Sequence, residues 1–468
     1  MSAPASTVPE LASASAGELA RRIAAKEVTS REVVEALLER IEAVNPGLQA
    51  IRVVLADEAL AAADEADGAV AAGADLGPLH GVPFTVKENL DVAGSATTSG
   101  LSAFVEAGAT RDAPSVAGLR AAGGIPMGRT NLAESGLRWH SYSDAGGHTV
   151  NPWDASRTPG GSSGGDAVAL ATGMTPLGIG NDLGGSLRIP SQFNGTVALK
   201  PTFGRVGSAT TVPPLDPPLA IQIMGVDGPM ARTVADLRLA FEPISAPDPR
   251  DPWQVPAPLQ GPPVPRRVAV ALWDGVHPDV AAGVRRAADA LAAAGWEVHD
   301  GEPPRVDDAL ATWTNVVVGE VRGIWALLEP VSSDEGRRWV GDVFKHVPAL
   351  EPMAHAMGYV EREALGREWG EWMQETPLVL APPCAHPPFE VGFDLTGSDA
   401  VAELFARMRM IAPVNLLGVP AVAVGAGLAD GLPQGVQVIG PRFREDLCFD
   451  AAQAIETALG TLTPIDPR

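Results

Sequence analysis

Residues 159–165 read Pro-Gly-Gly-Ser-Ser-Gly-Gly, the most unusual run in this chain of 468 residues. Glycine and serine in such a run often form a flexible linker. Here, however, the run lies between segments that carry packing signals. The glycines also flank the two serines on both sides, which indicates backbone angles that other residues adopt poorly. These features favour a packed functional loop over a linker.

The same run partly matches a second known pattern. Residues 160–164 fit the G-x-S-x-G elbow of α/β-hydrolases, in which the serine follows a hydrophobic strand directly. The preceding residues, 151–159, read Asn-Pro-Trp-Asp-Ala-Ser-Arg-Thr-Pro, which is typical of a loop. The elbow interpretation therefore fails on its context.

A second glycine-rich segment lies 20 residues further on, where residues 180–188 read Gly-Asn-Asp-Leu-Gly-Gly-Ser-Leu-Arg. The strand-like residues 177–179 lead into it. Successive residues such as Gly184, Gly185 and Ser186 can direct several backbone N–H groups towards one point, which is how an oxyanion hole forms without charged side chains. A serine at the end of such a turn can attack the carbonyl carbon. Taken alone, the pattern also fits a tight turn that happens to end in serine.

A third segment, residues 79–89, reads Leu-His-Gly-Val-Pro-Phe-Thr-Val-Lys-Glu-Asn and predicts a strand over 82–87. Only four of the 34 basic residues in the chain are lysines, and Lys87 is one of them. Lys87 either extends to solvent or pairs with Glu88, or burial keeps it neutral so that it can accept a proton. Because residues 81–87, 159–165 and 180–188 contain no histidine, Lys87 and Ser162 are the candidates for activating Ser186.

Composition excludes several classes of protein. The formal net charge of −23 disfavours partners such as nucleic acid and anionic membranes. No apolar run is long enough to span a bilayer, and residues 1–20 lack a secretory signal, so we expect a cytoplasmic protein. Two cysteines and eight scattered histidines predict neither a disulfide framework nor a metal site.

Patterning along the chain predicts one α/β domain over residues 1–468. We expect N-terminal helices over 1–75, a core over 76–242, a proline-rich connection over 243–265 and a helical insertion or lid over 306–375. Thr29-Ser-Arg-Glu32 fits a capping box, and Asn45-Pro-Gly47 is expected to stop the helix that it starts. Further helices are predicted at 56–72, 115–122 and 280–294, and strands at 125–127, 175–179, 197–199, 267–272, 296–298, 378–381 and 419–424.

Together these segments resemble the amidase signature family. The resemblance extends over nearly the whole chain and is weakest over 243–400. Its motifs are Gly81-Val-Pro-Phe-Thr-Val-Lys87, Gly128-Arg-Thr-Asn131, residues 159–165, Asp182-Leu-Gly-Gly-Ser186, Leu199-Lys-Pro-Thr-Phe-Gly-Arg205, Gly228-Pro-Met-Ala-Arg232, Asn415-Leu-Leu-Gly-Val-Pro420 and Gly435-Val-Gln-Val-Ile-Gly-Pro441. The family implies a large, twisted, mixed β-sheet with helices on both faces.

The resemblance also implies roles for particular residues. Ser186 would attack the carbonyl carbon, Ser162 would follow a cis peptide bond and shuttle the proton, and Lys87 would be the final base. The remaining family positions are the backbone N–H groups of Leu183, Gly184, Gly185 and Ser186 for the oxyanion, and Asp182 and Arg188 as supports. The sequence departs from the family at Asp166, where a small residue or glutamate is frequent, and at Asn194, which replaces a common cysteine.

The expected activity is hydrolysis of a small-molecule amide through an acyl-enzyme, without metal or cofactor. Ester or carbamate hydrolysis by the same site is an alternative. The glutaminase component of a tRNA-dependent amidotransferase is less favoured, because the segment Arg407-Met-Arg-Met-Ile411 lacks the acidic residue expected there. A non-catalytic scaffold is disfavoured by the presence of all three catalytic positions.

The sequence does not identify the substrate. We expect the acyl pocket to involve the residues after Asn131, including Trp139 and His140, together with the helical insertion. The tryptophans suggest an aromatic or apolar group, although core packing explains them equally well. A homodimer is a reasonable default for the oligomeric state.

Overall fold

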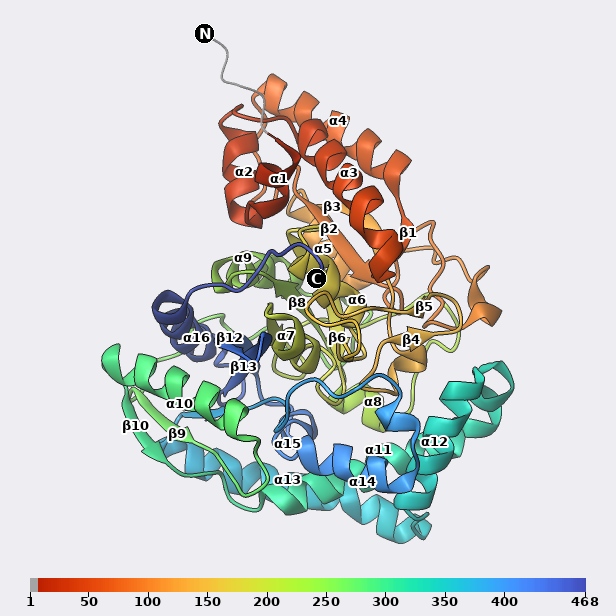
Figure 1. Cartoon of the computed structure of the whole chain (residues 1–468), viewed down its shortest axis with the longest axis vertical. Coiled ribbons are helices and arrows are strands. Elements are labelled where there is room, and N and C mark those ends of the chain that lie inside the picture. Colours follow the sequence, from red (N-terminus) through yellow and green to blue (C-terminus); the bar gives the residue numbers. More distant parts are fainter. Residues whose placement is uncertain (1–6) are drawn as a thin grey trace.

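A mixed sheet of eleven strands runs through the computed structural model, which describes residues 7–468 (Figure 1). Its strand order is β1-β3-β2-β6-β8-β7-β12-β13-β11-β9-β10. Parallel pairs join β3 to β2, β2 to β6, β11 to β9 and β9 to β10, and the other neighbours are antiparallel. The strands are β1 (Ile51–Val54), β2 (Pro83–Lys87), β3 (Ile125–Thr130), β6 (Leu177–Asp182), β7 (Val197–Lys200), β8 (Val226–Ala231), β9 (Arg267–Val270), β10 (Glu297–Asp300), β11 (Leu378–Ala381), β12 (Ala421–Ala429) and β13 (Leu432–Ile439), with a separate hairpin of β4 (Tyr142–Ser143) and β5 (Gly147–His148).

Helices cover the sheet on both faces, which confirms the expected fold class. They are α1 (Val8–Ser13), α2 (Ala16–Ala24), α3 (Ser30–Leu48), α4 (Ala56–Ala72), α5 (Pro114–Ala121), α6 (Gly164–Ala171), α7 (Arg188–Asn194), α8 (Leu219–Met224), α9 (Val234–Ile244), α10 (Pro278–Ala293), α11 (Val306–Leu328), α12 (Asp334–His346), α13 (Pro352–Glu375), α14 (Ser398–Arg407), α15 (Ala412–Leu416) and α16 (Glu445–Leu459). Short 3₁₀ turns are η1 (Ser102–Phe104), η2 (Glu134–Gly136), η3 (Glu329–Val331) and η4 (Phe393–Leu395).

Strand β11 shows how the two faces are separated. Leu378 and Leu380 pack into the larger core, with α3, α4, α10 and α16. Val379 and Ala381, which alternate with them, pack into a second core with α11 to α15. Because successive strand residues point to opposite faces, this short apolar run serves both cores at once.

The N-terminal helices largely follow the sequence patterns. Thr29 and Glu32 form the predicted capping box at the start of α3: the Glu32 N–H donates to Thr29 Oγ1 at 3.1 Å, and the Thr29 N–H donates to Glu32 Oε2 at 2.7 Å. The predicted stop at Asn45-Pro46-Gly47 is wrong, because α3 continues to Leu48 and ends at Gln49. Pro46 lies in the last turn of the helix, and the Asn45 side chain accepts hydrogen bonds from the N–H groups of Ala50 and Ile51 just beyond it.

The segment over residues 306–375 is helical, as predicted, and consists of α11, α12 and α13 with η3 between the first two. Residues 245–266 contain neither helix nor strand and connect α9 to β9. Strand β10 begins one residue later than predicted and extends to Asp300. In Figure 1, α11 to α14 lie at the opposite end of the molecule from α1 to α4. A lid function for this helical segment stays a prediction.

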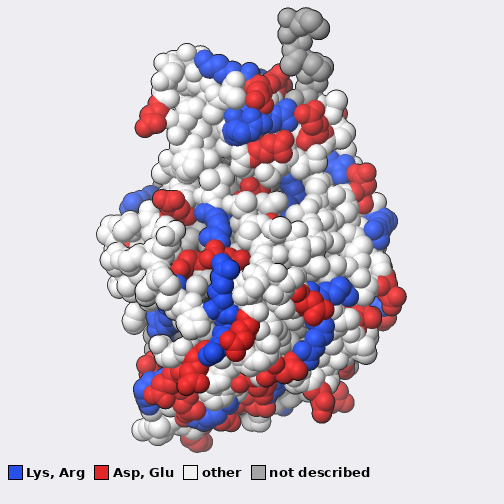
Figure 2. Space-filling model, turned by 90° about the vertical axis from the view of Figure 1, so that its left-hand side faces the viewer, with Lys and Arg blue, Asp and Glu red and all other residues white. Residues whose placement is uncertain are grey.

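The surface mixes charges of both signs. On the face drawn in Figure 2, acidic side chains alternate with basic ones, most densely over the lower half. None of the helices between residues 7 and 468 is long and apolar enough to cross a membrane. Within the same range, no group of three or more His, Cys, Asp or Glu side chains is arranged to hold a metal ion.

Candidate active site

Lys87 lies at the carboxyl end of β2 and is completely buried. Its Nζ donates to Ser162 Oγ at 2.7 Å and to Asn181 Oδ1 at 2.6 Å. Glu88, the alternative partner, instead forms an ion pair with Arg52. Of the two interpretations of Lys87, the geometry therefore excludes the exposed side chain and agrees with the buried one.

Burial lowers the pKa of Lys87 well below the usual range of a lysine, although the carboxyl groups of Asp166, Asp182 and Asp227 act in the opposite direction. Asp166 is also fully buried, in the first turn of α6. Burial raises the pKa of Asp166, and the nearby Thr130 hydroxyl and Lys87 partly offset that rise. Neither carboxyl oxygen of Asp166 has a hydrogen bond of ordinary geometry within residues 7–468. Lys87 and Asp166 are therefore both fully buried, and the charge of each affects the pKa of the other.

The loop over residues 159–163 brings Ser162 to Lys87. No strand precedes this loop, which agrees with the rejection of the elbow pattern, and the Gly161–Ser162 peptide bond is cis. A Cβ atom at Gly161 would lie 2.6 Å from the backbone oxygen of Arg138, so this position has no room for a side chain. The Ser162 carbonyl accepts a hydrogen bond from the Ala133 N–H at 3.1 Å. The glycines thus allow close backbone packing, as their pattern indicated.

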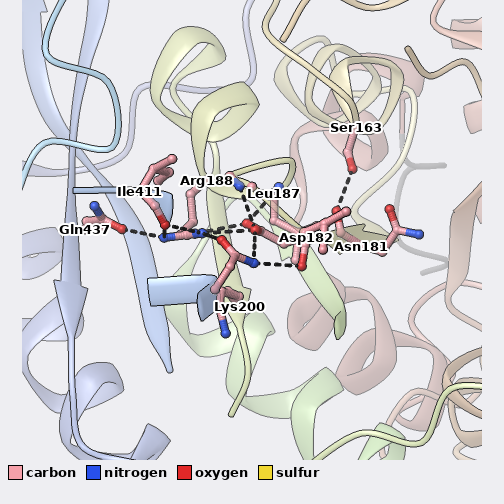
Figure 3. Close-up of polar contacts among 12 residues, drawn as sticks. Ser163, Asn181, Asp182, Leu187, Arg188, Lys200, Ile411 and Gln437 are labelled. Atoms are coloured by element: carbon pink, nitrogen blue, oxygen red, sulfur yellow. Dashed lines mark hydrogen bonds and ion pairs between the residues drawn. The ribbon is translucent and has the colours of Figure 1, made fainter. Parts of the chain in front are cut away.

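Asp182 organises the turn that carries Ser186 (Figure 3). Its carboxylate accepts from the N–H groups of Gly185 at 2.7 Å and Leu187 at 3.2 Å. It also accepts from Arg188 Nε at 2.9 Å and Nη2 at 3.0 Å. Burial alone would raise the pKa of Asp182, but the charge and hydrogen bonds of Arg188 hold it well below its usual range.

Arg188 extends this network to strand β13 and to helix α15 with the residue before it. Its guanidinium donates to Gln437 Oε1 at 2.9 Å, to Asn415 Oδ1 at 2.5 Å and to the carbonyl of Ile411 at 3.3 Å (Figure 3). Asn415 in turn donates to Asp182 Oδ1 at 2.9 Å. The sequence singled out Asp182 and Arg188, but the roles of Asn415 and Gln437 depend on contacts with residues more than 220 positions away, so only their motifs could have indicated them.

The backbone N–H groups around Ser186 are not equivalent. The Gly185 N–H is occupied by Asp182, so in this structure it is not free to bind an oxyanion, contrary to the expectation for that residue. Among residues 7–468, the N–H groups of Leu183, Gly184 and Ser186 have no hydrogen-bond partner. Trp313 donates to the Leu183 carbonyl at 3.1 Å and Trp139 to the Gly184 carbonyl at 2.8 Å, which fixes the orientation of both peptide planes.

The side chain of Ser186 lies where two chambers meet. It is 6% exposed, and its hydroxyl has no hydrogen-bond partner within the described residues. One chamber, of about 80 Å³, is lined mainly by apolar side chains, and the other, of about 620 Å³, which we call the polar chamber, is lined by a mixture of polar and apolar side chains. Ser162 lines only the polar chamber. No hydrogen bond joins the hydroxyls of Ser162 and Ser186 in the part of the chain that the structure describes, although both face the polar chamber.

The apolar chamber is built largely from the helical segment and the residues after Asn131. Five aromatic side chains line it, from the loop before β4 and from α11, α12 and α14: Trp139, Trp313, Trp339, Phe344 and Phe405. Trp139 was expected here, whereas His140 is buried away from the chamber and bonds to Thr158 and His148. Trp313 lies in the helical insertion that was expected to contribute to this pocket, but the sequence did not single it out, because its contact with Leu183 spans 130 residues.

Comparisons with known proteins relate the chain to one family. A sequence model of the amidase family matches residues 32–449. The chain is 41% identical over 460 residues to an indoleacetamide hydrolase of Bradyrhizobium diazoefficiens, covering 96% of this chain and 87% of that protein. It is 34% identical to a component of the glutamyl-tRNA(Gln) amidotransferase of Salinispora arenicola, covering 97% and 99% of the two chains. A solved 6-aminohexanoate cyclic dimer hydrolase with bound substrate superposes with a TM-score of 0.85 at 28% identity, over 98% of this chain and 99% of that one.

Proposed function

The chain belongs to the amidase signature family and hydrolyses carbon–nitrogen bonds, and we propose that its substrate is a small primary arylacetamide. The observation that carries this proposal is the aromatic chamber that opens directly at Ser186. Its small size, about 80 Å³, favours a compact acyl group over a long chain. The similarity to indoleacetamide hydrolase makes indole-3-acetamide the first substrate to test.

In the proposed mechanism, Ser186 Oγ bonds to the carbonyl carbon while its proton passes through Ser162 to Lys87. The buried, neutral form of Lys87 is suited to accept that proton. The N–H groups of Leu183, Gly184 and Ser186 are the candidate donors to the developing oxyanion. As the carbon–nitrogen bond breaks, Ser162 returns a proton to the leaving nitrogen. Water then releases the acid by the same path in reverse.

The test is a rate assay on acetamide, phenylacetamide, indole-3-acetamide, a long-chain amide, glutamine and an aryl carbamate, with wild type and Ser186→Ala. We expect kcat/KM to be highest for an arylacetamide and to fall by about 10⁴-fold or more in the variant, since the nucleophile is removed. Turnover that survives the substitution would remove Ser186 from this role. Preferred hydrolysis of the carbamate or of an ester would establish the alternative reaction of the same site.

A further inference from the structure

The two chambers beside Ser186 differ sharply in charge. Within residues 7–468, the polar chamber is lined by five aspartates and a single basic residue, Arg250. Asp182 is neutralised by Arg188, and Arg250 is held at 2.7 Å by Asp248, which does not line the chamber. None of the four remaining carboxyl groups forms an ion pair within the part of the chain that the structure describes. They belong to Asp91, Asp216, Asp227 and Asp251.

One of these carboxyl groups, that of Asp227, lies close to the reaction centre. Asp227 is opposite Asn181 in the β6–β8 pair, and Asn181 is the residue that accepts a hydrogen bond from Lys87. Asp227 is 4% exposed, and its only side-chain hydrogen bond within residues 7–468 comes from Ser115 Oγ at 2.9 Å. Burial raises the pKa of Asp227 to about 7, against the opposing effects of the Ser115 hydrogen bond and the charge of Lys87. The carboxylates of Asp251 and Asp91 add smaller effects on this pKa in the same direction as burial. Such mutual repulsion is relieved when a cation enters.

One carboxyl oxygen of Asp227 has no hydrogen-bond partner within residues 7–468. Ser115 donates to Asp227 Oδ2, whereas Oδ1 has no hydrogen-bond partner among the described residues, and Asp227 lines the chamber. A carboxylate oxygen of this kind accepts hydrogen bonds from an ammonium group. The chamber therefore offers an acceptor as well as negative charge.

The position of Ser162 sets which part of a substrate enters each chamber. The leaving nitrogen must lie near Ser162, because it takes its proton from that hydroxyl under the proposed function, on which this inference rests. Ser162 lines the polar chamber and not the apolar one. The acyl group then occupies the aromatic chamber, and any substituent on the nitrogen extends into the acidic chamber.

We propose that the enzyme also hydrolyses secondary arylacetamides whose amine part carries a positive charge, with the acidic chamber as the binding site of that cation. Ser186 Oγ forms the acyl bond, the carbon–nitrogen bond breaks, and the amine leaves with a proton from Ser162. Water then cleaves the ester, so that one amide and one water give one carboxylic acid and one diamine.

The test compares N-(2-aminoethyl)phenylacetamide with its neutral isostere, N-propylphenylacetamide, at pH 8, where the terminal amine is charged. We expect kcat/KM for the cationic amide to exceed that for the neutral one by about tenfold or more, because the attraction acts in a partly desolvated cleft. Added salt should reduce this ratio. Asp227→Asn and the more exposed Asp251→Asn should each reduce it, whereas Asp289→Asn, an exposed aspartate on α10 outside this chamber, should leave it unchanged.

A wild-type ratio of one or less would overturn the inference while turnover of phenylacetamide upheld the proposed function. A ratio unaffected by Asp227→Asn and Asp251→Asn would also overturn it. Faster hydrolysis of 4-(aminomethyl)phenylacetamide than of phenylacetamide would place the acidic chamber on the acyl side, against the assignment made here. No turnover of any phenylacetyl amide would overturn the proposed function and this inference with it.

Discussion

Asp166 sets the proton affinity of Lys87 without a hydrogen bond to it. The negative charge of Asp166 favours the protonated lysine and so raises its pKa, against the larger lowering by burial. The proposed mechanism requires the neutral amine, so activity should fall as the pH drops through the pKa of Lys87. The glutamate or small residue more frequent at this position in the family marked Asp166 as a departure, and its burial now gives that departure a physical meaning.

Asp166→Asn should therefore move the acidic limb of the kcat/KM–pH profile to lower pH. Without the carboxylate, Lys87 loses its proton more readily, and a shift of about one pH unit corresponds to about 1.4 kcal/mol of lost charge interaction. The profile is measured between pH 5 and 9, with Asp450→Asn on the exposed side of α16 as a control. A limb that stays in place or moves to higher pH would contradict the assigned interaction.

The Asp182–Arg188 pair is predicted to contribute to stability as well as to the shape of the nucleophile turn. Arg188→Met leaves a fully buried carboxylate without its charged partner, which should cost about 3–5 kcal/mol in the free energy of unfolding. Urea titration monitored by tryptophan fluorescence gives that value. Arg285→Met, which breaks an ion pair between half-exposed residues, is the matched control and should change stability little. Equal losses in the two variants would show that burial adds nothing to the pair.

At the scale of elements, α12 is held against the catalytic core by its amino end. Glu134 Oε1 accepts from the Ser333 N–H at 2.7 Å, and Glu134 Oε2 accepts from the Ser333 hydroxyl. One turn later, Arg138 bonds to Glu335 at 2.7 Å. The same helix supplies Trp339 to the aromatic chamber. These contacts couple residues 134–138 to one wall of the aromatic chamber.

Glu134→Ala should remove the hydrogen bonds that hold the amino end of α12 and so lower the preference for aromatic acyl groups. We expect the ratio of kcat/KM for phenylacetamide to that for acetamide to fall about tenfold, because acetamide does not reach α12. Glu134→Gln keeps an acceptor oxygen and should restore much of the ratio. Asp334→Ala changes an exposed residue in the first turn of the same helix and serves as the control. Parallel losses on both substrates would mean that Glu134 supports the fold and not the chamber.

Sequence patterns predicted elements well where the signal is local. The capping box at Thr29, the strand that ends at Lys87 and the helix at 56–72 all depend on neighbouring residues, and the structure contains them. Pro46 misled the prediction because a proline in the last helical turn removes one backbone hydrogen bond without ending the helix. The Asn45 side chain then binds the N–H groups of Ala50 and Ile51 just beyond the helix.

In the candidate site, too, the sequence predicted the residues that stand in local motifs but not the contacts between distant residues. Lys87, Ser162 and Ser186 stand in motifs with fixed spacing, so the sequence alone could name them, although their catalytic roles stay proposals. The hydrogen bond between Glu134 and Ser333 joins residues 199 positions apart. In the polar chamber, Asp91 lines the same cavity as Asp227 and Asp251, which lie far from it in the sequence. Neither periodicity nor composition specifies such juxtapositions, which arise from the order of strands in the sheet.

At the scale of the whole molecule, net charge bears on the likeness to a component of a tRNA-dependent amidotransferase. Proteins that bind tRNA gain affinity by releasing counterions from phosphate groups, which requires a basic surface. This chain has a formal net charge of −23, and acidic side chains alternate with basic ones on the face drawn in Figure 2. We therefore expect an enzyme that acts without nucleic acid. Its cytoplasmic location and homodimeric state stay predictions.

The purified chain alone should hydrolyse arylacetamides and should not bind tRNA in a filter-binding assay at about 50 mM salt, since repulsion between like charges is strongest at low ionic strength. Glutamine should be a poor substrate, because its charged α-amino and α-carboxylate groups would have to enter a chamber lined by aromatic side chains. Addition of tRNA should leave the rate on phenylacetamide unchanged. Micromolar tRNA binding that weakens with salt, together with a kcat/KM for glutamine above that for phenylacetamide, would instead assign the chain to the amidotransferase reaction, and the aromatic chamber would then need another occupant.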